Sequence, residues 1–532
     1  MISQNSDSSG ALYAHLESQR VQLQVELDSG RSQAERNRLG QFATPPELAR
    51  DILATAKKLI GHAQVRFLDP AFGTGAFDYA LLASFRRKQI AVLEGYEIDP
   101  YYGVPARHLW EQTGVVLHLR DFTKAHAPTT ESERFNLIVC NPPYVRHHHI
   151  AVEDKDRLRR LCLRTSGLRA GGLSGLYCYF FVLSHNWLAE NGLGFWLIPS
   201  EFMDVNYGLW VKRYLIEKVT LLRIHRFDPN EVQFGDALVS SAVVCFRKAL
   251  PSANHRVEFS FGGTLDNPRL EGHVPLTVLR HERKWTRFPE REQRRGSGYV
   301  LGDFFAIKRG LATGGNSYFI LTAQRSRELE LPKRFLRPIL PSPRHVTGNE
   351  VLADQQGNPI IEPQLFLVDC GLPEETVRRD YPTLWSYFEE DKRRGLADRY
   401  LCRHRTPWYA QEDRPAAPIV ATYMGRSVNG SKNPFRFIRN RSKATAANVY
   451  LLMYPKGALS SMLQSRPELT DRIWAMLKRF DARTLLAEGR VYGGGLHKLE
   501  PKELARVPAD EIATLLKLPP RAAAFQLELL SV

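Results

Sequence analysis

The four residues Asn141-Pro142-Pro143-Tyr144 directly follow the apolar run Leu137–Cys140. An apolar run of this kind is typical of a strand that is buried on both faces of a parallel sheet. Two consecutive prolines cannot continue such a strand, so the chain must leave the sheet as a stiff loop at its carboxyl edge. Because open α/β sheets bind their ligands at that edge, the loop is expected to contact a ligand.

A second loop that is suited to ligand binding has the sequence DPAFGTGAF at residues 69–77, between a predicted strand and a predicted helix. Gly73 and Gly75 let its backbone bend sharply and approach a ligand closely. The loop departs from the G-x-G-x-x-G fingerprint and from the G-x-x-x-x-G-K-[ST] phosphate loop, which disfavours a phosphate ligand.

Acidic residues stand at the ends of the next two predicted strands. Glu97 in GYEIDP is suited to bind a ribose diol, since a carboxylate accepts two hydroxyl protons at once. Asp121 in RDF is suited to accept from an adenine amino group, with Phe122 as a stacking face. Taken singly, each acid could instead cap the helix that follows it. Together with the glycine loop, the two acids outline a nucleoside without phosphates, which S-adenosylmethionine fits better than NAD.

These motifs need a sheet that brings the ends of separate strands together. Apolar runs predict seven strands, at residues 65–70, 91–100, 115–122, 135–144, 192–200, 219–227 and 238–248. Strands that alternate with helical patterns indicate an α/β fold with a doubly wound, mostly parallel, Rossmann-like sheet. Residues 1–39 are polar with leucines at helical spacing, so a helical N-terminal extension is expected there.

The length of 532 residues predicts two or three domains, and the charge is unevenly distributed along them. Of the net charge of +16, residues 1–250 carry +3 and the remainder carries +13. This asymmetry favours a polyanion as the partner of the C-terminal part, although a solvated basic surface would have the same composition. There is no apolar run of 18 residues and no signal peptide, and the six cysteines are scattered; a cytoplasmic protein with reduced thiols and no membrane span is therefore expected.

The ordered set GQFATPPELA (40–49), DPAFGTGAF, GYEIDP, LRDF and NPPY resembles the motifs of the amino-methyltransferases. It resembles most closely the gamma-class DNA adenine-N6 methyltransferases of type II restriction–modification systems, the TaqI-like methylases. The resemblance implies an S-adenosylmethionine-dependent catalytic domain at residues 40–250, after the helical extension at 1–39. A polar, basic stretch suggests a linker or lip at 251–300, and the resemblance implies a mixed α+β DNA target-recognition domain at 301–532.

The resemblance also implies roles for single residues, motif by motif. Thr44 is expected beside the methionine part of S-adenosylmethionine, and Glu97 is expected to hold its ribose. The cofactor loop would be lined by Asp69, Ala71, Gly73 and Gly75, and the adenine would be framed by Ile98, Asp121 and Phe122. An aromatic residue that packs on the target base is expected from residues 231–244. Phe234 is the candidate and Tyr207 the alternative, although Phe234 could equally anchor the core or a loop.

In such an enzyme the NPPY loop would act on an adenine amino nitrogen, which is a poor nucleophile because its lone pair is delocalised into the ring. If the side-chain oxygen of Asn141 and the carbonyl of Pro142 each accept one N6 proton, the nitrogen is drawn toward tetrahedral geometry. Its lone pair then faces the sulfonium methyl group. Pro142 and Pro143 hold the loop in shape. Tyr144 offers an aromatic face for the base, which must first be flipped out of the duplex.

A basic C-terminal domain would bind phosphates and read base edges. Residues 301–316 and 435–450 are the expected DNA-facing segments, although each could be a solvated basic loop. The candidate contacts are Lys308, Arg309, Asn316, Arg436, Arg439, Arg441 and Lys443. His147–His149 follow the NPPY loop and are expected near DNA or substrate, because neighbours on a strand point to opposite faces and cannot readily share a metal. No metal site is expected.

Three other functions stay open. Enzymes with an NPPY motif also methylate RNA bases and protein glutamines, and cytosine N4 poses the same chemical problem. A fused restriction–modification enzyme would also cut DNA, but no convincing PD…E-x-K nuclease motif is found. A DNA-binding module with an inactive cofactor fold would not need the intact NPPY, Glu97 and Asp121. The favoured partners are double-stranded DNA and a functionally paired restriction endonuclease, and the enzyme itself is expected to be a monomer.

Overall fold

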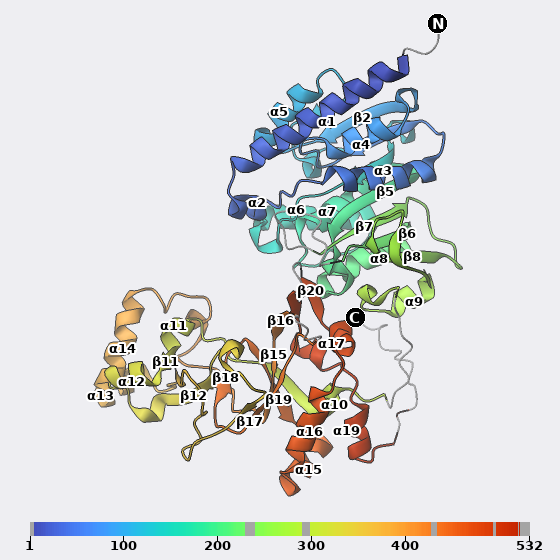
Figure 1. The fold of residues 1–532 in the computed structure, drawn as a ribbon. Helices are drawn as coiled ribbons and strands as arrows, with labels where there is room; N and C mark the ends of the chain where they lie inside the picture. The colour runs from blue at the N-terminus through green and yellow to red at the C-terminus, as the bar shows by residue number, and fades with distance from the viewer. Residues whose placement is uncertain are drawn as a thin grey trace. The chain divides into compact units, whose positions relative to one another are not determined.

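The computed structural model of the chain describes residues 5–228, 240–289, 298–426, 433–492, 496–519 and 521. The chain divides into two compact units. Unit 1 consists mainly of Met1–Glu292, and unit 2 mainly of Gln293–Val491 and Gly495–Val532. In Figure 1 the elements of unit 1 run from blue to green and those of unit 2 from yellow to red.

Unit 1 is built on one large sheet. Within the described residues, nine strands lie in the order β3-β2-β1-β4-β5-β7-β6-β8-β9. All of them run in one direction except β7 and β9, which pair antiparallel with their neighbours. Their bounds are β1 Val65–Asp69, β2 Ile90–Tyr96, β3 Val116–His118, β4 Phe135–Cys140, β5 Leu188–Pro199, β6 Thr220–Arg226, β7 Ser241–Arg247, β8 Arg256–Gly263 and β9 Pro268–Pro275.

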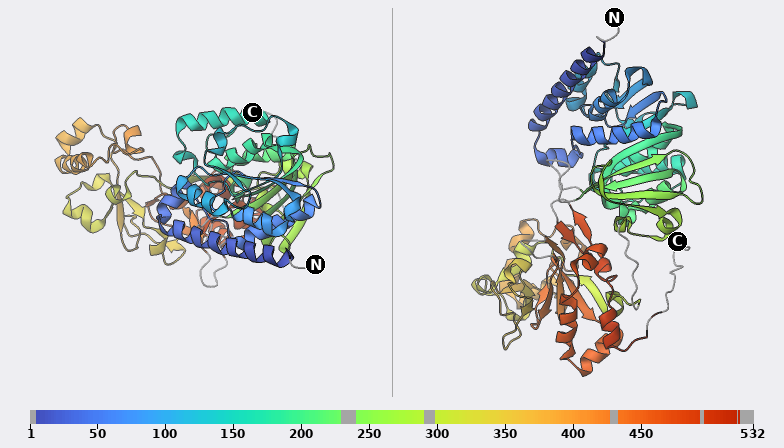
Figure 2. Two further views of the ribbon diagram at one scale, coloured as in Figure 1. Left: turned by 90° about the horizontal axis from the view of Figure 1, so that it is seen from above. Right: turned by 45° about the vertical axis from the view of Figure 1, so that its right-hand side comes forward.

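Helices cover both faces of this sheet. Chain order runs outward from β1 toward β3 and outward from β4 toward β6, so right-handed crossovers place the two groups of helices on opposite faces. Figure 2, left, shows the two helical layers with the sheet between them. The adjacent ends of β1 and β4 form the switch point at which such sheets bind ligands. The helices are α3 Pro46–Ile60, α4 Ala76–Ser84, α5 Pro100–Trp110, α6 Val152–Ser166, α7 Leu176–Leu183 and α8 Leu209–Glu217.

All seven predicted strands are present, and the predicted α/β fold is confirmed, but β8 and β9 extend the sheet. They come from the segment 251–300 that was expected to be a linker, and α9 (Leu276–His281) follows them. The expectation is wrong for this part because Val257 and Phe259 of β8 are buried in the core of unit 1. β9 escaped prediction because it is an edge strand with mostly exposed residues and lacks apolar alternation.

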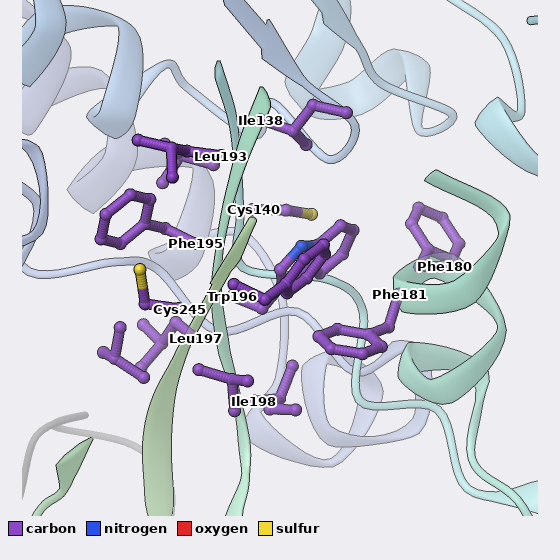
Figure 3. Close-up of a cluster of buried hydrophobic side chains, with 14 of the residues drawn as sticks. Ile138, Cys140, Phe180, Phe181, Leu193, Phe195, Trp196, Leu197, Ile198 and Cys245 are labelled. Carbon is purple, nitrogen blue, oxygen red and sulfur yellow. The ribbon is translucent and has the colours of Figure 1, made fainter. Parts of the chain in front are cut away.

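Large apolar side chains on both faces of the sheet hold its centre in place. Phe195 and Trp196 are neighbours in β5 and project to opposite faces, as Figure 3 shows. The ring of Trp196 packs edge-on against Phe181 of α7, with centroids 5.3 Å apart. The residues Leu137–Cys140 of β4 are fully buried beside them. This packing fixes the point at which the NPPY loop leaves the sheet.

The N-terminal helices are part of the same layered structure. α1 (Asn5–Ser29) and α2 (Gln33–Leu39) occupy most of the segment predicted to be helical. α1 lies against α4 and α5, as Figure 1 shows, and these helices follow the two predicted cofactor motifs. The hydroxyl of Tyr102 in α5 donates to Asp28 of α1 at 2.8 Å. α1 therefore touches the elements that would form a cofactor site.

Unit 2 has the mixed α+β fold that was predicted. Its three described sheets have the orders β10-β19-β15-β17-β13, β11-β14-β12-β18 and β16-β21-β20. The strands are β10 Phe305–Arg309, β11 Ile320–Thr322, β12 Leu336–Leu340, β13 Glu350–Val351, β14 Leu365–Val368, β15 Ile419–Thr422, β16 Met424–Arg426, β17 Phe437–Asn440, β18 Thr445–Ala446, β19 Tyr450–Pro455, β20 Arg490–Tyr492 and β21 Leu496–Lys498.

The helices of unit 2 pack around these sheets. They are α10 Leu301–Phe304, α11 Asn316–Phe319, α12 Ala323–Glu328, α13 Glu374–Asp380, α14 Pro382–Arg393, α15 Gly457–Ser465, α16 Leu469–Lys478, α17 Ala482–Glu488, α18 Pro501–Leu504 and α19 Asp510–Leu515. Across both units, all six cysteines are free and buried, as predicted. None of the helices in the described part of the chain is long and apolar enough to cross a membrane.

Candidate cofactor and target-base site

Asn141 begins the NPPY loop at the end of β4, and its side chain is held in one orientation. Its Nδ2 donates to the main-chain oxygen of Phe42 at 2.9 Å and to Oγ1 of Thr44 at 3.1 Å. Both amide protons are therefore used. Its Oδ1 is buried and accepts no hydrogen bond from any residue that the structure describes. A buried acceptor without a donor is costly, by about 1–3 kcal/mol, and such groups are rare in folded proteins.

Tyr144, at the end of the loop, is anchored from three sides. Its main-chain N–H donates to Gly40 O at 3.0 Å, and its hydroxyl donates to Leu197 O at 3.0 Å. Its ring lies against Phe42, with centroids 5.4 Å apart, and only 8% of the residue is exposed. The predicted aromatic face is thus largely covered in this conformation. Pro142 is buried as well, and Pro143 is half-buried.

The loop DPAFGTGAF leaves the neighbouring strand β1 and contains an open space. A Cβ atom added to Gly73, whose φ is +56°, would meet no atom within 4 Å. By contrast, a Cβ on Gly75 would lie 2.6 Å from the indole of Trp110, so this glycine is needed for close packing. The loop therefore has open space beside Gly73 and is closely packed against Trp110 at Gly75.

Asp69 lies at the base of this loop and is almost completely buried. Its Oδ1 accepts from the main-chain N–H of Ala71 at 3.0 Å. Burial raises the pKa of Asp69 to about 8, the Ala71 N–H opposes this, and the nearby carboxylate of Glu97 adds to it. Asp69 and Ala71 are thus hydrogen-bonded to each other at the start of the loop.

Glu97 follows β2 and faces the same loop. Its Oε2 accepts from Gly73 N at 3.0 Å, and its Oε1 accepts from Asp99 N at 2.8 Å. Burial raises the pKa of Glu97 above its ordinary value, although the N–H groups of Asp99 and Gly73 oppose the shift. Each oxygen can accept a second hydrogen bond, so the carboxylate can still bind a diol. The helix that follows is capped by Asp99 and not by Glu97, so capping does not explain Glu97.

The side chain of Ile98 is 65% exposed, next to Glu97, and offers an apolar surface. Asp121 caps the short helix after β3, because its Oδ1 accepts from the N–H and the hydroxyl of Thr123, both at 2.8 Å. Its Oδ2 lies 3.9 Å from Nη2 of Arg157. Phe122 is 2% exposed and packs against Tyr96, Phe180 and Trp187. The expectation of an open stacking face at Phe122 is therefore wrong, because the ring is part of the core.

The remaining predicted residues of unit 1 lie near the NPPY loop or outside the described part. Phe234 lies outside the described residues. Tyr207 is half-buried after β5, and its hydroxyl donates to Glu201 at 3.2 Å. His147–His149 form a short 3-10 helix and not a strand. In the described part of the chain, no group of three His, Cys, Asp or Glu side chains could hold a metal ion.

Four residues near these motifs were not predicted: Arg31, Gly40, Gln41 and Asp99. Gly40 has φ +68°, and a Cβ there would lie 2.4 Å from Tyr144 N, so only glycine fits. The available signal was its place at the end of the predicted N-terminal helical segment and at the start of GQFATPPELA, since a glycine at a helix end often has a left-handed conformation. Arg31 and Gln41 had no such signal, because their partner Asp99 is 68 and 58 positions away.

The predicted DNA contacts of unit 2 differ in how free their side chains are. Each of the three guanidinium nitrogens of Arg436 donates to an acceptor among Pro343 O, Val346 O, Gly348 O and Asn349 Oδ1. Arg436 is therefore a structural residue, and its prediction as a DNA contact is corrected. Arg439 and Arg441 both pair with Asp471. Arg309 lies over the ring of Tyr423 at 4.1 Å, and Asn316 accepts from Thr313. Lys308 and Lys443 are exposed.

Two parts of the chain match known protein families. Residues 107–233 match the model of the Eco57I restriction-modification methylase family, and residues 285–522 match the model of the C-terminal domain of the type II methyltransferase M.Eco57I. Type II methyltransferase M.AccI of Acinetobacter calcoaceticus is 26% identical over 88% of this chain and 85% of its own. M.XamI of Xanthomonas campestris pv. amaranthicola is 26% identical over 90% of this chain and 86% of its own.

Among solved structures, the DrdV–DNA complex has a TM-score of 0.49 and 13% identity, and the match covers 91% of this chain and 58% of that one. This chain thus spans less than two thirds of the length of DrdV. The two family models describe one kind of enzyme and match separate parts of the chain, and the two curated relatives align with it over most of their length. Together these similarities support a DNA methyltransferase of a type II restriction–modification system.

Proposed function

We propose that the chain is a site-specific DNA methyltransferase that transfers the methyl group of S-adenosylmethionine to N6 of a flipped-out adenine in double-stranded DNA. The observation that carries this proposal is the orientation of Asn141. Its amide donates both protons to Phe42 O and Thr44 Oγ1, and its buried Oδ1 accepts from no described donor. An amino group that enters the site would supply the missing proton.

The residues of unit 1 fit S-adenosylmethionine. Glu97 would hold the ribose hydroxyls, and the open space beside Gly73 would admit the part of the cofactor next to the loop. Ile98 would cover the adenine of the cofactor. Asp121 would accept from the adenine amino group through Oδ2, because its Oδ1 already accepts from Thr123. When bound, S-adenosylmethionine supplies an electrophilic methyl group on a sulfonium centre.

The protein acts on the target nitrogen through position and fixed dipoles. Asn141 Oδ1 would accept one N6 proton and the Pro142 carbonyl the other, which draws the lone pair out of the ring plane. The loop is held in shape, because Tyr144 is hydrogen-bonded to Gly40 and Leu197 and Asn141 to Phe42. Tyr144, with Phe234 or Tyr207, would contact the base.

Unit 2 would bind the DNA. The basic balance of +13 after residue 250 favours a polyanion, and phosphate contacts would offset the cost of extruding a base, which is a few kcal/mol. Of the predicted contacts, Lys308 and Lys443 present exposed ammonium groups. The enzyme would act as a monomer and protect its site from a paired restriction endonuclease.

The decisive experiment is nucleoside mass spectrometry on unmethylated plasmid DNA after incubation with the protein and S-adenosylmethionine. The expected product is N6-methyladenine with the wild type and not with Asn141→Ala. Calorimetry with S-adenosylhomocysteine serves as the control, because Asn141→Ala should bind it as the wild type does. Methylcytosine as the product would show that cytosine, and not adenine, is the target base. Methyl groups on RNA or protein alone would refute the assignment of DNA as substrate.

A further inference from the structure

The carboxylate of Asp99, two residues after Glu97, is held by the N-terminal segment. Arg31 donates to both of its oxygens, from Nη1 to Oδ2 and from Nη2 to Oδ1 at 3.2 Å. Gln41 Nε2 also donates to Oδ2, at 2.8 Å, while its own Oε1 accepts from Arg31 at 2.9 Å. The guanidinium of Arg31 lies over the ring of Tyr101, 4.3 Å from its centroid. The three side chains therefore form one closed hydrogen-bonded node.

This node fixes the position of the predicted diol acceptor. The main-chain N–H of Asp99 donates to Glu97 Oε1 at 2.8 Å, so movement of Asp99 would move one of the two N–H groups that orient Glu97. Burial raises the pKa of Asp99, but the hydrogen bonds from Arg31 and Gln41 outweigh it and the pKa lies below its ordinary value. Asp99 is thus charged at neutral pH, and its bonds to Arg31 are charge-assisted.

The same segment is bonded to the catalytic loop. Gln41 stands between Gly40, whose carbonyl accepts from Tyr144 N, and Phe42, whose carbonyl accepts from Asn141 Nδ2. A side chain that points to the cofactor motif is therefore flanked by two carbonyls that hold the NPPY loop. Residues 40–42 therefore connect the NPPY loop, through two main-chain carbonyls, with Asp99 of the cofactor motif, through the side chain of Gln41.

A separate contact of α1 lies next to Gly73, whose main-chain N–H is the second donor to Glu97. Thr74 follows Gly73 in the cofactor loop, and its hydroxyl donates to Gln24 at 2.8 Å and accepts from Arg20 at 3.2 Å. Arg20 is 2% exposed. The N-terminal segment therefore supports both main-chain N–H groups that donate to Glu97: α1 acts through Thr74, and Arg31 and Gln41 act through Asp99.

We propose that Gln41 and Arg31 are positioning residues, which hold Glu97 for the cofactor ribose through Asp99 and, through Gln41, set the NPPY loop relative to it. The proposal rests on the proposed function, since it assigns the cofactor site to Glu97. It gives the N-terminal segment a part in cofactor binding. Neither residue touches the reacting atoms.

The test is calorimetric titration of the full-length protein with S-adenosylhomocysteine, which needs no DNA and no turnover. Gln41→Ala and Arg31→Ala should each raise Kd about tenfold, because each loses a hydrogen bond to a charged group. Arg31→Lys should recover part of the affinity. The double variant should lose less than the product of the two single effects, because both act through one carboxylate. Arg38→Ala, an exposed arginine of α2, is the matched control and should bind as the wild type.

Kinetics on plasmid DNA separate the two roles. Arg31→Ala should raise KM for S-adenosylmethionine and leave kcat within twofold, whereas Gln41→Ala should raise KM and also lower kcat several-fold at saturating cofactor. Unchanged Kd in both alanine variants would overturn the proposal, as would equal losses in Arg38→Ala. If the alanine variants do not fold, Arg31→Lys and Gln41→Asn carry the same test with smaller expected changes, and unchanged Kd in both would overturn it.

The outcomes also distinguish this inference from the proposed function. A wild type that does not bind S-adenosylhomocysteine would refute the proposed cofactor. A wild type that binds it and methylates DNA, with variants of equal affinity, would refute only the positioning role.

Discussion

Asn141 Nδ2 lies 2.9 Å from the main-chain oxygen of Phe42, which stands 99 positions earlier in the chain. This bond and a second one to Oγ1 of Thr44 turn the nitrogen of the Asn141 amide toward residues 42–44. The oxygen is left as the acceptor of the site. The motif FATPP therefore orients the first residue of the NPPY loop.

Thr44→Val should lower kcat about fivefold, since one hydrogen bond that orients Asn141 is lost, worth about 1 kcal/mol. Thr44→Ser keeps the hydroxyl and should retain activity close to that of the wild type. Steady-state methylation of plasmid DNA measures both. Equal activity of the valine and serine variants would show that Phe42 O alone orients the amide.

Gly40→Ala should lower both activity and thermal stability. Its φ of +68° costs a side chain about 1–2 kcal/mol, and the new Cβ would also lie 2.4–2.6 Å from main-chain atoms of Tyr144 and Val145. Gly167→Ala is a matched control, because Gly167 has the same left-handed conformation, with φ +72°, and open space around its Cβ.

Both glycine variants should lose stability in thermal unfolding, but only Gly40→Ala should lose kcat, at least several-fold. A Gly167→Ala variant with the same loss of kcat would mean that backbone strain, and not displacement of the NPPY loop, is the cause.

The pKa of Asp69, raised to about 8 by burial, makes stability depend on pH. Between about pH 4 and pH 8 the folded protein keeps a proton that the unfolded chain has released, so this contribution to the free energy of unfolding falls as pH rises. It is fully present below about pH 4 and is lost as pH passes through about 8. Asp69→Asn, which cannot ionise, should remove it.

Thermal unfolding of the cofactor-free protein at several pH values checks this. The Tm of the wild type minus that of Asp69→Asn should fall from pH 5 to pH 8 and then level off. A difference that rises with pH over this range would reverse the sign and contradict the raised pKa.

Lys308→Ala and Arg436→Ala should affect different properties of unit 2, the first its DNA binding and the second its stability. Lys308 is exposed, so its loss should weaken DNA binding and reduce the slope of log K against log salt by about 0.9, the value for one phosphate contact. Arg436 holds main-chain carbonyls near residues 343–349, so its loss should lower Tm by several degrees. Fluorescence anisotropy with duplex DNA at several salt concentrations and thermal unfolding measure the two effects. A normal Tm in Arg436→Ala, with a reduced salt slope, would restore it as a DNA contact.

The positions of the seven strands along the chain and the place of the motifs could be predicted because they depend on local patterns. Buried runs such as Leu137–Cys140 and glycine loops such as that at Gly73 have the same meaning wherever they occur in an α/β protein. β9 could not be predicted, because an exposed edge strand carries no apolar alternation. Phe122 was misplaced because a buried ring and a stacking ring look alike in sequence.

The sequence by itself determined that Asn141, Gly73, Glu97 and Asp121 stand at strand ends of one sheet, because parallel strands bring their carboxyl ends to one edge. Only the tertiary structure decided how these side chains are held. Phe42 and Thr44 orient Asn141, and Arg31 and Gln41 hold Asp99, across separations of 58 to 99 positions. Contacts over such distances leave no periodic signal, because they arise from the packing of whole elements and not from neighbouring residues.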